Sequence, residues 1–477
     1  MEKYDVVIVG AGPAGIFAAI KLTETAGARS PKIAGARSPL KVLIVEKGKD
    51  IEKRHCPMKV KEVSCAACPE CALLSGWGGA GAFSDGKLNL SPDIGGFLTR
   101  YVEKTELLSL IDYVDGLYVK FGAPKKVYGG DSEETREIER LASKNDLIFV
   151  PSRIRHIGTE KCAGLLKAMK KRLNEKVKTI FDSDVEKILI KGAGSPRVKG
   201  GKVGGVRLRD GREIQADFVI LAPGREGARW LEAETKRLKL GVLQNPVDIG
   251  VRVEVPASVF SHLTDIAYEP KLVFYSKKFD DKVRVFCVNP YGEVVKEYLK
   301  GIWTVNGHSY ARRKTNNTNF ALLVSTTFTE PFNEPISYGR YIARLANFLG
   351  QGVIVQRLGD LQMGRRSTHE RIEKGIVRPT LDATPGDLSF VIPYRYLSDI
   401  LEMLEALDKI APGLNSRHTL LYGVEVKFYS MQLKLTNALE TEVENLFAVG
   451  DGAGVSRGLV QASASGVIAA REILKRV

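Results

Sequence analysis

The stretch YDVVIVGAGPAGIFAAIKL, which begins at Tyr4, constrains the fold more than any other part of the sequence. It has the pattern of a short apolar strand, a glycine turn and a helix, with the G-x-G-x-x-G spacing at Gly10, Gly12 and Gly15. In such a turn the first glycine permits the tight bend, the second lets the backbone approach a phosphate, and the third lets the helix pack on the strand. The start of the helix then presents free N–H groups to the phosphates. The stretch predicts a Rossmann-type, doubly wound α/β domain.

An acidic residue at the end of the second strand normally completes this pattern by binding ribose hydroxyls. The segment KVLIVEKG supplies Glu46, but it lies 36 residues beyond Gly10, where about 20 is usual. Between the two, residues 26–41 contain one eight-residue unit written twice, as AGARSPKI and AGARSPLK. Without these sixteen residues the spacing is the usual one. We therefore interpret the repeat as an insertion in a surface loop, where added length costs little.

Two distant segments have the pattern of further strands of the same domain. VILAPG ends an apolar strand at Ala222 and Gly224, where small residues let the chain pass beside a ligand. ENLFAVGDGAG begins at Glu444 and places Asp451 in a turn, before a helix rich in Ala, Ser and Gly. A carboxylate there can accept hydrogen bonds from hydroxyl groups. We therefore expect a discontinuous domain, made of residues 1–110, 150–245 and 426–477.

Together these motifs resemble the flavoproteins that bind FAD in an extended form, in the glutathione-reductase-like superfamily. More narrowly, GWGGAGAFSDGKL, NPYGEVV with VNGHSYARR, GRRST and VGDGAGVSRGLVQASASGV resemble the uncharacterised FAD-dependent dehydrogenase family. The resemblance runs from end to end of the chain. It implies FAD as the cofactor and an oxidoreductase acting on a small molecule, and it names no substrate.

The resemblance also implies where the cofactor would lie. The pyrophosphate would meet the first glycine turn, the adenosine ribose would meet Glu46, and the adenine would meet the backbone of Val185. The ribityl chain would lie by Asp451, and the flavin ring by the start of the last helix. The implied contact residues are Gly10, Gly12, Pro13, Ala14, Gly15, Glu46, Lys47, Val185, Ala222, Gly224, Gly450, Asp451, Gly458, Leu459 and Val460.

A glycine-rich loop, GWGGAGAFSDGKL, follows the second strand. In related flavoproteins a loop at this place passes the pyrophosphate and the flavin. Its glycines allow close approach of the backbone, and Trp77 and Phe83 are unusual residues for a flexible surface loop. We expect cofactor contacts from Gly79, Ala80, Gly81, Ser84 and Lys87.

Four of the six cysteines crowd together just before this loop, at Cys56, Cys65, Cys68 and Cys71. The C-x-x-C-x-x-C spacing suits three ligands of an iron–sulfur cluster, and zinc also accepts four thiolates. A redox dithiol beside the flavin and structural thiols are the alternatives. The Cys-Pro pair comes first here, whereas in ferredoxins it comes last. We treat the four cysteines as candidate metal ligands and leave the alternatives open.

Residues 246–425 have the pattern of several short strands, so we expect a β-rich cap or substrate domain of mixed α+β type there. Residues 111–149 would form a connecting helical segment. Substrates would bind where the domains meet, since pockets favour domain interfaces. His308 stands near Arg312 and Arg313 in the sequence, yet a loop histidine is more often only exposed to solvent, so we assign no catalytic residue.

The charge balance and the chain start limit the partners. The chain has 71 Lys and Arg against 56 Asp and Glu, a net charge of +15, but no long basic run interleaved with aromatic residues. We therefore expect no stable nucleic-acid partner. No apolar run has the length of a membrane helix, and the start lacks a secretory signal, so we expect a cytoplasmic protein without a stable membrane partner. The electron carrier, NAD(P)H or ferredoxin, stays open.

The function that these features favour is that of an FAD-dependent oxidoreductase acting on a small molecule, with a possible electron relay through the cysteines. Two alternatives of other substrate classes remain, a flavin-dependent RNA-modifying enzyme and an isoprenoid or lipid reductase at a membrane surface. A protein that uses FAD only as a structural or sensing ligand is the non-catalytic alternative.

Overall fold

The computed structural model describes the whole chain except residues 1, 25–38, 58–67, 69, 85, 192–200, 244–245, 300, 310–313, 329–333 and 429–430. The chain forms two compact units, each of them discontinuous in sequence. Unit 1 comprises Met1–Lys126, Ile154–Gln244 and Ser430–Val477, and unit 2 comprises Val127–Arg153 and Asn245–Tyr429. Most of the repeated insertion at residues 26–41 lies outside the described residues.

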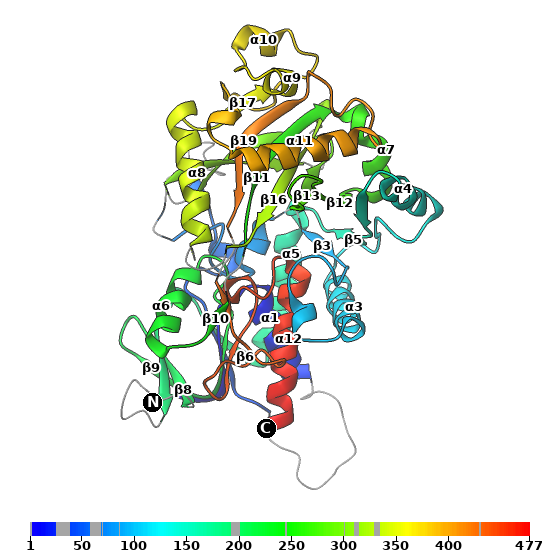
Figure 1. Cartoon of the computed structure of the whole chain (residues 1–477). Coiled ribbons are helices and arrows are strands. Elements are labelled where there is room, and N and C mark those ends of the chain that lie inside the picture. The colour runs from blue at the N-terminus through cyan, green and yellow to red at the C-terminus, as the bar shows by residue number, and fades with distance from the viewer. Residues whose placement is uncertain are drawn as a thin grey trace. The chain divides into compact units, whose positions relative to one another are not determined.

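A seven-stranded sheet forms the centre of unit 1 (Figure 1). Its parallel strands run in the order β6 (Val177–Ile180), β2 (Val42–Val45), β1 (Lys3–Val9), β9 (Glu213–Leu221) and β21 (Leu446–Ala448). The antiparallel strands β7 (Val185–Lys191) and β8 (Lys202–Leu208) extend the sheet beside the beginning of β9. β2 is buried along its whole length, as its unbroken apolar sequence predicts for a strand covered on both faces. The expected Rossmann-type fold is confirmed.

Two helices pack against each other beside this sheet. They are α1 (Pro13–Glu24) and α12 (Leu459–Arg476), from opposite ends of the chain. A Cβ atom added at Gly466 would overlap the carbonyl oxygen of Ala14, so the two helices approach as closely as their backbones allow. The small residues of both helices make this approach possible, which brings the two helix N-termini to the same edge of the sheet.

The remaining elements of unit 1 surround this centre. The helices are α3 (Lys104–Lys120), α5 (Thr159–Asn174) and α6 (Ala228–Leu238), with the short turns η2 (Ile51–Lys53), η3 (Gly79–Phe83), η4 (Leu98–Arg100) and η6 (Asp451–Ala453). Two small antiparallel pairs are β3 (Lys87–Asn89) with β5 (Ile154–His156), and β10 (Val242–Leu243) with β20 (Gln432–Leu433).

Unit 2 is built on an eight-stranded, mostly antiparallel sheet. Its strands run in the order β18 (Thr384–Pro385), β17 (Ile354–Arg357), β19 (Leu420–Lys427), β11 (Val247–Pro256), β16 (Asn317–Thr326), β13 (Lys282–Asn289), β12 (Lys271–Tyr275) and β4 (Leu147–Val150). A separate hairpin consists of β14 (Glu293–Leu299) and β15 (Ile302–His308). The helices are α4 (Glu133–Ser143), α7 (Ala257–Ala267), α8 (Pro335–Gly350), α9 (Leu358–Gln362), α10 (His369–Glu373) and α11 (Tyr394–Asp408), with the turn η5 (Leu388–Phe390).

Residues 111–149, which we expected to connect the domains, divide between the units. The end of α3 belongs to unit 1, whereas α4 and β4 belong to unit 2. The physical reason is that β4 pairs with β12 and thereby becomes the edge strand of the large sheet.

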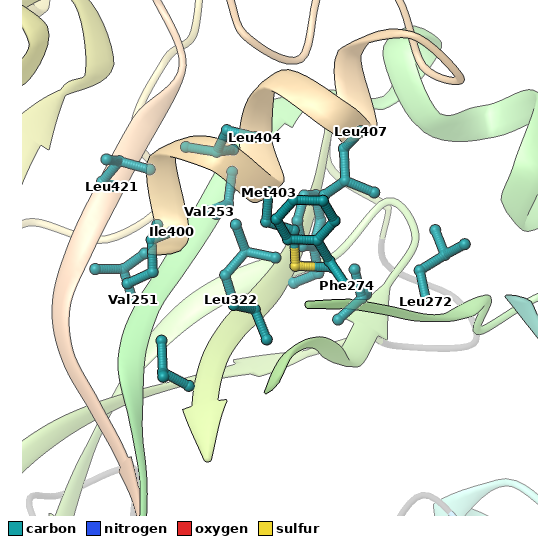
Figure 2. Close-up of a cluster of buried hydrophobic side chains, with 14 of the residues drawn as sticks. Val251, Val253, Leu272, Phe274, Leu322, Ile400, Met403, Leu404, Leu407 and Leu421 are labelled. Atoms are coloured by element: carbon teal, nitrogen blue, oxygen red, sulfur yellow. The ribbon is translucent and has the colours of Figure 1, made fainter. Parts of the chain in front are cut away.

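The hydrophobic core of unit 2 lies between its sheet and α11. Figure 2 shows Ile400, Met403, Leu404 and Leu407 of α11 together with apolar residues of the strands, among them Val251. The alternate residues of β11 are polar and equally buried: Arg252 forms an ion pair with Glu425, and neither side chain is exposed. Both faces of the sheet are therefore covered, one by an apolar core and one by a polar network.

Candidate functional site

The three glycines of the first turn have different surroundings. Gly10 has φ +104°, and a Cβ atom there would overlap the carbonyl oxygen of Ala222. A Cβ atom at Gly15 would overlap the carbonyl oxygen of Gly10. At Gly12, by contrast, no described atom outside Gly12 and its two chain neighbours lies within 4 Å of the position a Cβ atom would take. The protein itself thus requires glycine at the first and third positions, while the second faces open space in which a ligand fits.

The starts of two helices, α1 and α12, lie near the glycine turn. The first hydrogen bond within α1 runs from the N–H of Ile16 to the carbonyl of Gly12, and that within α12 from Ala462 to Gly458. The N–H groups that precede these bonds have no partner within their own helix. Gly450 lies beside Ala14, because a Cβ atom added there would be 3.1 Å from the Cβ of Ala14. The site therefore offers anion-binding donors from both ends of the chain.

Glu46 joins three segments of the site through one carboxylate. The side chain is buried. Its Oε2 accepts a hydrogen bond from the N–H of Ala11 at 2.7 Å, and its Oε1 accepts from Gly48 and Gly76, both at 2.9 Å. An ionised carboxylate has about four acceptor positions, so roughly one remains for a ribose hydroxyl. Glu46 both fixes the glycine turn and remains able to bind a ribose.

The glycine-rich loop lies directly against the first turn. The N–H of Gly78 donates to the carbonyl of Ala11 at 2.8 Å, and a Cβ atom at Gly79 would lie 3.2 Å from the Cα of Gly12. A Cβ atom at Gly81 would lie 2.7 Å from Leu459. Larger residues at these positions would displace the loop from the turn and from the start of α12.

Three other loop residues that we expected at the cofactor, Ala80, Ser84 and Lys87, differ in their exposure and contacts. Ala80 is exposed. The hydroxyl of Ser84 donates to the carbonyl of Gly81 at 3.0 Å and accepts from the N–H of Gly86 at 3.2 Å, so it holds the loop's own shape. Lys87 begins β3, and its Nζ is buried.

The return strand β9 reaches the turn at its carboxyl end. The N–H of Ala222 donates to the carbonyl of Val9 at 2.8 Å. Gly224 has φ +61° and no described atom within 4 Å of its Cβ position, a second open position of the same kind as Gly12. The Nζ of Lys47 lies 4.0 Å from the carboxylate of Glu226, which follows Gly224 by two residues in the chain.

The turn after β21 carries the acidic residue predicted for the ribityl region. The carboxylate of Asp451 accepts from the hydroxyl of Ser456 at 2.7 Å and from the Nε of Arg225 at 3.2 Å. The N–H of Gly450 donates to the hydroxyl of Ser465 at 2.9 Å, and Val460 of α12 is buried. The Arg225–Asp451 pair thus links the β9 loop to the C-terminal turn.

Val185 lies at the start of β7 and is buried. The connection that leads to it runs along the end of β2, where the N–H of Ser183 donates to the carbonyl of Glu46 at 3.0 Å. The structure therefore brings the turn, Glu46, the glycine loop, Gly224 and both helix starts together within unit 1. Their contact with a cofactor stays a prediction.

Arg54 is a residue of this site that the sequence pattern does not indicate. This arginine is buried, with its Nε donating to the carbonyl of Ala72 at 2.9 Å and its Nη1 to that of Trp77 at 2.6 Å. Burial lowers the pKa of Arg54 to about 10, although nearby Glu46 acts in the opposite direction. Arg54 therefore holds the segment from Ala72 to Trp77, which leads into the glycine loop. In the sequence it stands in the charged run KGKDIEKR, which is typical of a solvated surface.

The cysteine segment is only partly within the described residues. Cys56 and Cys71 are half-buried, Cys68 is exposed and all three are free thiols, while Cys65 lies outside the described part of the chain. In the part of the chain that the structure describes, no three His, Cys, Asp or Glu side chains are grouped as metal ligands. The predicted metal site therefore stays a prediction.

Of the groups considered for substrate chemistry, the structure describes His308 alone. His308 is exposed at the end of β15, and Arg312 and Arg313 lie outside the described residues.

Among the residues that the structure describes, no helix combines the length and the apolar character that a membrane span requires.

The fold and these contacts define the class: a protein with one Rossmann-type unit and a second, mostly antiparallel unit. Residues 246–428 match the family model described as FAD-dependent protein, C-terminal domain-like, and residues 395–477 match the model for glucose inhibited division protein A. These two matches confirm the resemblance to FAD-dependent proteins that the motifs indicate.

A protein of Clostridium beijerinckii, described as uncharacterized, is 28% identical over 495 residues, which covers 98% of this chain and 80% of that protein. Among solved structures, Aspergillus oryzae formate oxidase is 12% identical over 100% of this chain and 98% of that one, with a TM-score of 0.45. A 3-ketosteroid dehydrogenase of Rhodococcus jostii is 14% identical over 99% and 97%, with a TM-score of 0.41. These values identify no substrate and no residue role.

Proposed function

We propose that the chain is an FAD-dependent oxidoreductase that acts on a small molecule, with FAD held by unit 1. The open position at Gly12 carries this proposal: the glycine loop lies against the turn, yet no described atom beyond Gly12 and its chain neighbours lies within 4 Å of the Cβ position. Glycine there leaves room for a pyrophosphate to approach the backbone. The family match of residues 246–428 supports FAD as the ligand.

The residues of the site suit FAD in their chemistry. The N–H groups at the start of α1 would hold the pyrophosphate, and one acceptor position of Glu46 would bind the adenosine ribose. Bound FAD would supply hydride transfer through its flavin ring. The start of α12, with its positive dipole end, would favour negative charge placed beside it. Glu46, Arg54 and the loop they fix would keep this arrangement rigid.

A glycine replacement tests the placement of the cofactor. Gly12→Val should lower FAD affinity by at least about tenfold, because a side chain would occupy the phosphate position. The thermal unfolding midpoint of the FAD-free protein should change little, since the Cβ position is open to the described residues beyond the chain neighbours. Gly116→Val is the matched control, because Gly116 also has no described atom within 4 Å of its Cβ position but lies on the exposed face of α3.

Visible absorbance of the purified proteins gives the flavin content. Flavin in the Gly116→Val protein and none in the Gly12→Val protein would support the site. Equal flavin in both would contradict it. Anaerobic addition of NADH, NADPH or reduced ferredoxin then tests the activity. One of these donors should bleach the bound flavin, whereas failure of every donor would favour a non-catalytic role for FAD.

The electron relay through the cysteines is a separate part of the proposal. Cys71 begins the turn that leads into the glycine loop, with the N–H of Ser75 donating to its carbonyl at 2.9 Å. Cys71 is therefore close in sequence and in structure to the start of the loop beside Gly12. An assay of iron and acid-labile sulfide in the anaerobically purified protein tests for an iron–sulfur cluster. Iron-free protein with full FAD content would contradict a cluster.

A further inference from the structure

The outer face of α8 in unit 2 is apolar although it is exposed. The inner face, with Ile342, Ala343 and Ala346, is buried in the unit. On the opposite face Tyr341 is 70% and Phe348 is 81% exposed, and Leu345 and Leu349 are exposed as well. A surface helix normally places polar residues on the side away from the core. This helix is apolar on both sides, so its outer face needs an explanation.

The β14–β15 hairpin extends this apolar surface. Asn347 of α8 accepts a hydrogen bond from the N–H of Trp303 at 2.7 Å and donates to its carbonyl at 2.8 Å, which joins helix and hairpin. The exposed rings of Trp303 and Tyr298 lie 4.9 Å apart between centroids. We name as the α8 patch the residues Tyr298, Trp303, Tyr341, Leu345, Phe348 and Leu349. Large apolar side chains that are exposed on neighbouring elements are typical of an interaction site.

Positive charge accompanies the α8 patch. Arg344 is exposed on the same helix, one turn from both Tyr341 and Phe348, and Lys296 is exposed on β14 two residues before Tyr298. The whole chain has a net charge of +15. Aromatic, aliphatic and cationic side chains in one surface are complementary to a layer that is apolar inside and anionic at its boundary.

Two other occupants fit less well. A second copy of the chain, bound symmetrically, would place the same patch against itself and would bring like charges from Arg344 together. Single-stranded nucleic acid binds aromatic side chains by stacking, and Leu345 and Leu349 have no ring on which a base could stack. The aliphatic residues instead suit contact with acyl chains.

We propose that the α8 patch binds peripherally to an anionic lipid surface. The aromatic and leucine side chains enter the boundary between headgroups and acyl chains, and Arg344 and Lys296 meet the lipid phosphates. The chain then lies on a membrane surface without spanning it. This inference differs from our expectation that the chain has no stable membrane partner, and it does not depend on FAD binding.

Co-sedimentation of the full chain with vesicles tests the inference. The chain should sediment with vesicles that contain phosphatidylglycerol, and less with pure phosphatidylcholine or at high salt. Phe348→Ser should weaken the binding by about tenfold, because the variant loses an aromatic side chain that would enter the lipid boundary. Arg344→Glu should weaken it only for the anionic vesicles. Phe390→Ser is the matched control, since Phe390 is 73% exposed in the same unit and is not part of the α8 patch.

Three outcomes would overturn the inference. The first is the absence of co-sedimentation with the anionic vesicles. The second is equal loss of binding in the Phe348→Ser and Phe390→Ser variants, since the patch would then have no special role. The third is a dimer in light scattering that Phe348→Ser converts to a monomer, because a second copy would then cover the patch. Thermal unfolding midpoints of the variants, expected to equal that of the unchanged chain, show that each one folds.

Discussion

At the scale of single residues, one carboxylate performs two tasks. Glu46 accepts three backbone hydrogen bonds that join the first glycine turn to the loop at Gly76, and the same group is the predicted ribose ligand. Hydrogen bonds to a charged acceptor are worth more than neutral ones. The residue that would recognise the cofactor is therefore also one that builds the site.

Glu46→Gln should destabilise the FAD-free protein by about 1–3 kcal/mol. The amide keeps one acceptor oxygen, but its NH₂ group would face a backbone N–H that needs an acceptor. FAD affinity should fall as well. Urea unfolding measures the first effect and flavin titration the second.

Glu52→Gln is the control for this substitution. Glu52 pairs at the surface with Lys167, and such pairs contribute little, so stability should stay within about 0.5 kcal/mol. Equal effects of the two substitutions would show that the buried hydrogen bonds of Glu46 have no special weight.

The sequence predicts which segments form the site, but it does not predict which residues hold these segments in place. Gly10, Gly12, Gly15 and Glu46 stand in a spacing that follows from backbone geometry, so their proximity could be predicted. Arg54 could not, because its burial depends on the loop from Ala72 to Trp77, which folds back over it. A charged residue within a charged run gives no sign of such a contact.

At the scale of elements, the packing of α1 on α12 positions both helix starts. Gly466 makes this packing possible, since a Cβ atom there would overlap the carbonyl of Ala14. In an exposed helix, glycine-to-alanine replacement stabilises by about 1 kcal/mol. In a contact this close the same change forces the backbones apart, which costs about 1–3 kcal/mol.

Gly466→Ala should therefore lower both stability and flavin content, whereas Gly116→Ala in α3 should raise stability. The two variants contain the same chemical change in helices of the same unit. Thermal unfolding and visible absorbance report the results. A stabilised Gly466→Ala protein would mean that α1 and α12 are farther apart than described.

A second element, α11, carries a buried acid. Asp399 is fully buried, and its burial together with the charge of Asp281 raises its pKa from 3.8 to about 6. Between these two values the folded chain keeps a proton that the unfolded chain has lost. The free energy of unfolding therefore falls as pH rises through this window, and it stays low above it.

Asp399→Asn should remove this dependence. The variant should be more stable than the unchanged chain at pH 7, by about 1–3 kcal/mol, and the difference should vanish near pH 4. Urea unfolding across this range measures it. An unchanged slope with pH in the variant would assign the dependence to another group.

Local patterns predicted most strands but not their partners. The apolar runs of β1, β2 and β9 indicate buried strands by themselves. The place of β4 does not follow from its sequence, because its partner β12 is about 120 residues further along the chain. Which strands pair over such sequence distances depends on the packing of the complete sheet and not on the local sequence.

At the scale of the whole molecule, three separated segments of the chain make one compact unit, which we propose binds FAD. A ligand that binds only the folded form stabilises the parts it contacts. FAD should therefore slow amide hydrogen exchange in peptides from α1, the glycine loop and the start of α12 together. Peptides of α11 should not change. Mass spectrometry resolves these segments, and protection confined to one of them would contradict a shared site.

The use of both chain ends in one site has a consequence for synthesis. As the ribosome releases the chain, β1 and α1 appear first, yet β21 and α12 complete their sheet and helix pair only after more than four hundred further residues. The strands and helices of unit 2 emerge in between and can assemble earlier. If unit 1 binds FAD as we propose, cofactor loading must wait until α12 has been made, and a chain that stops before α12 should contain a folded unit 2 but no flavin.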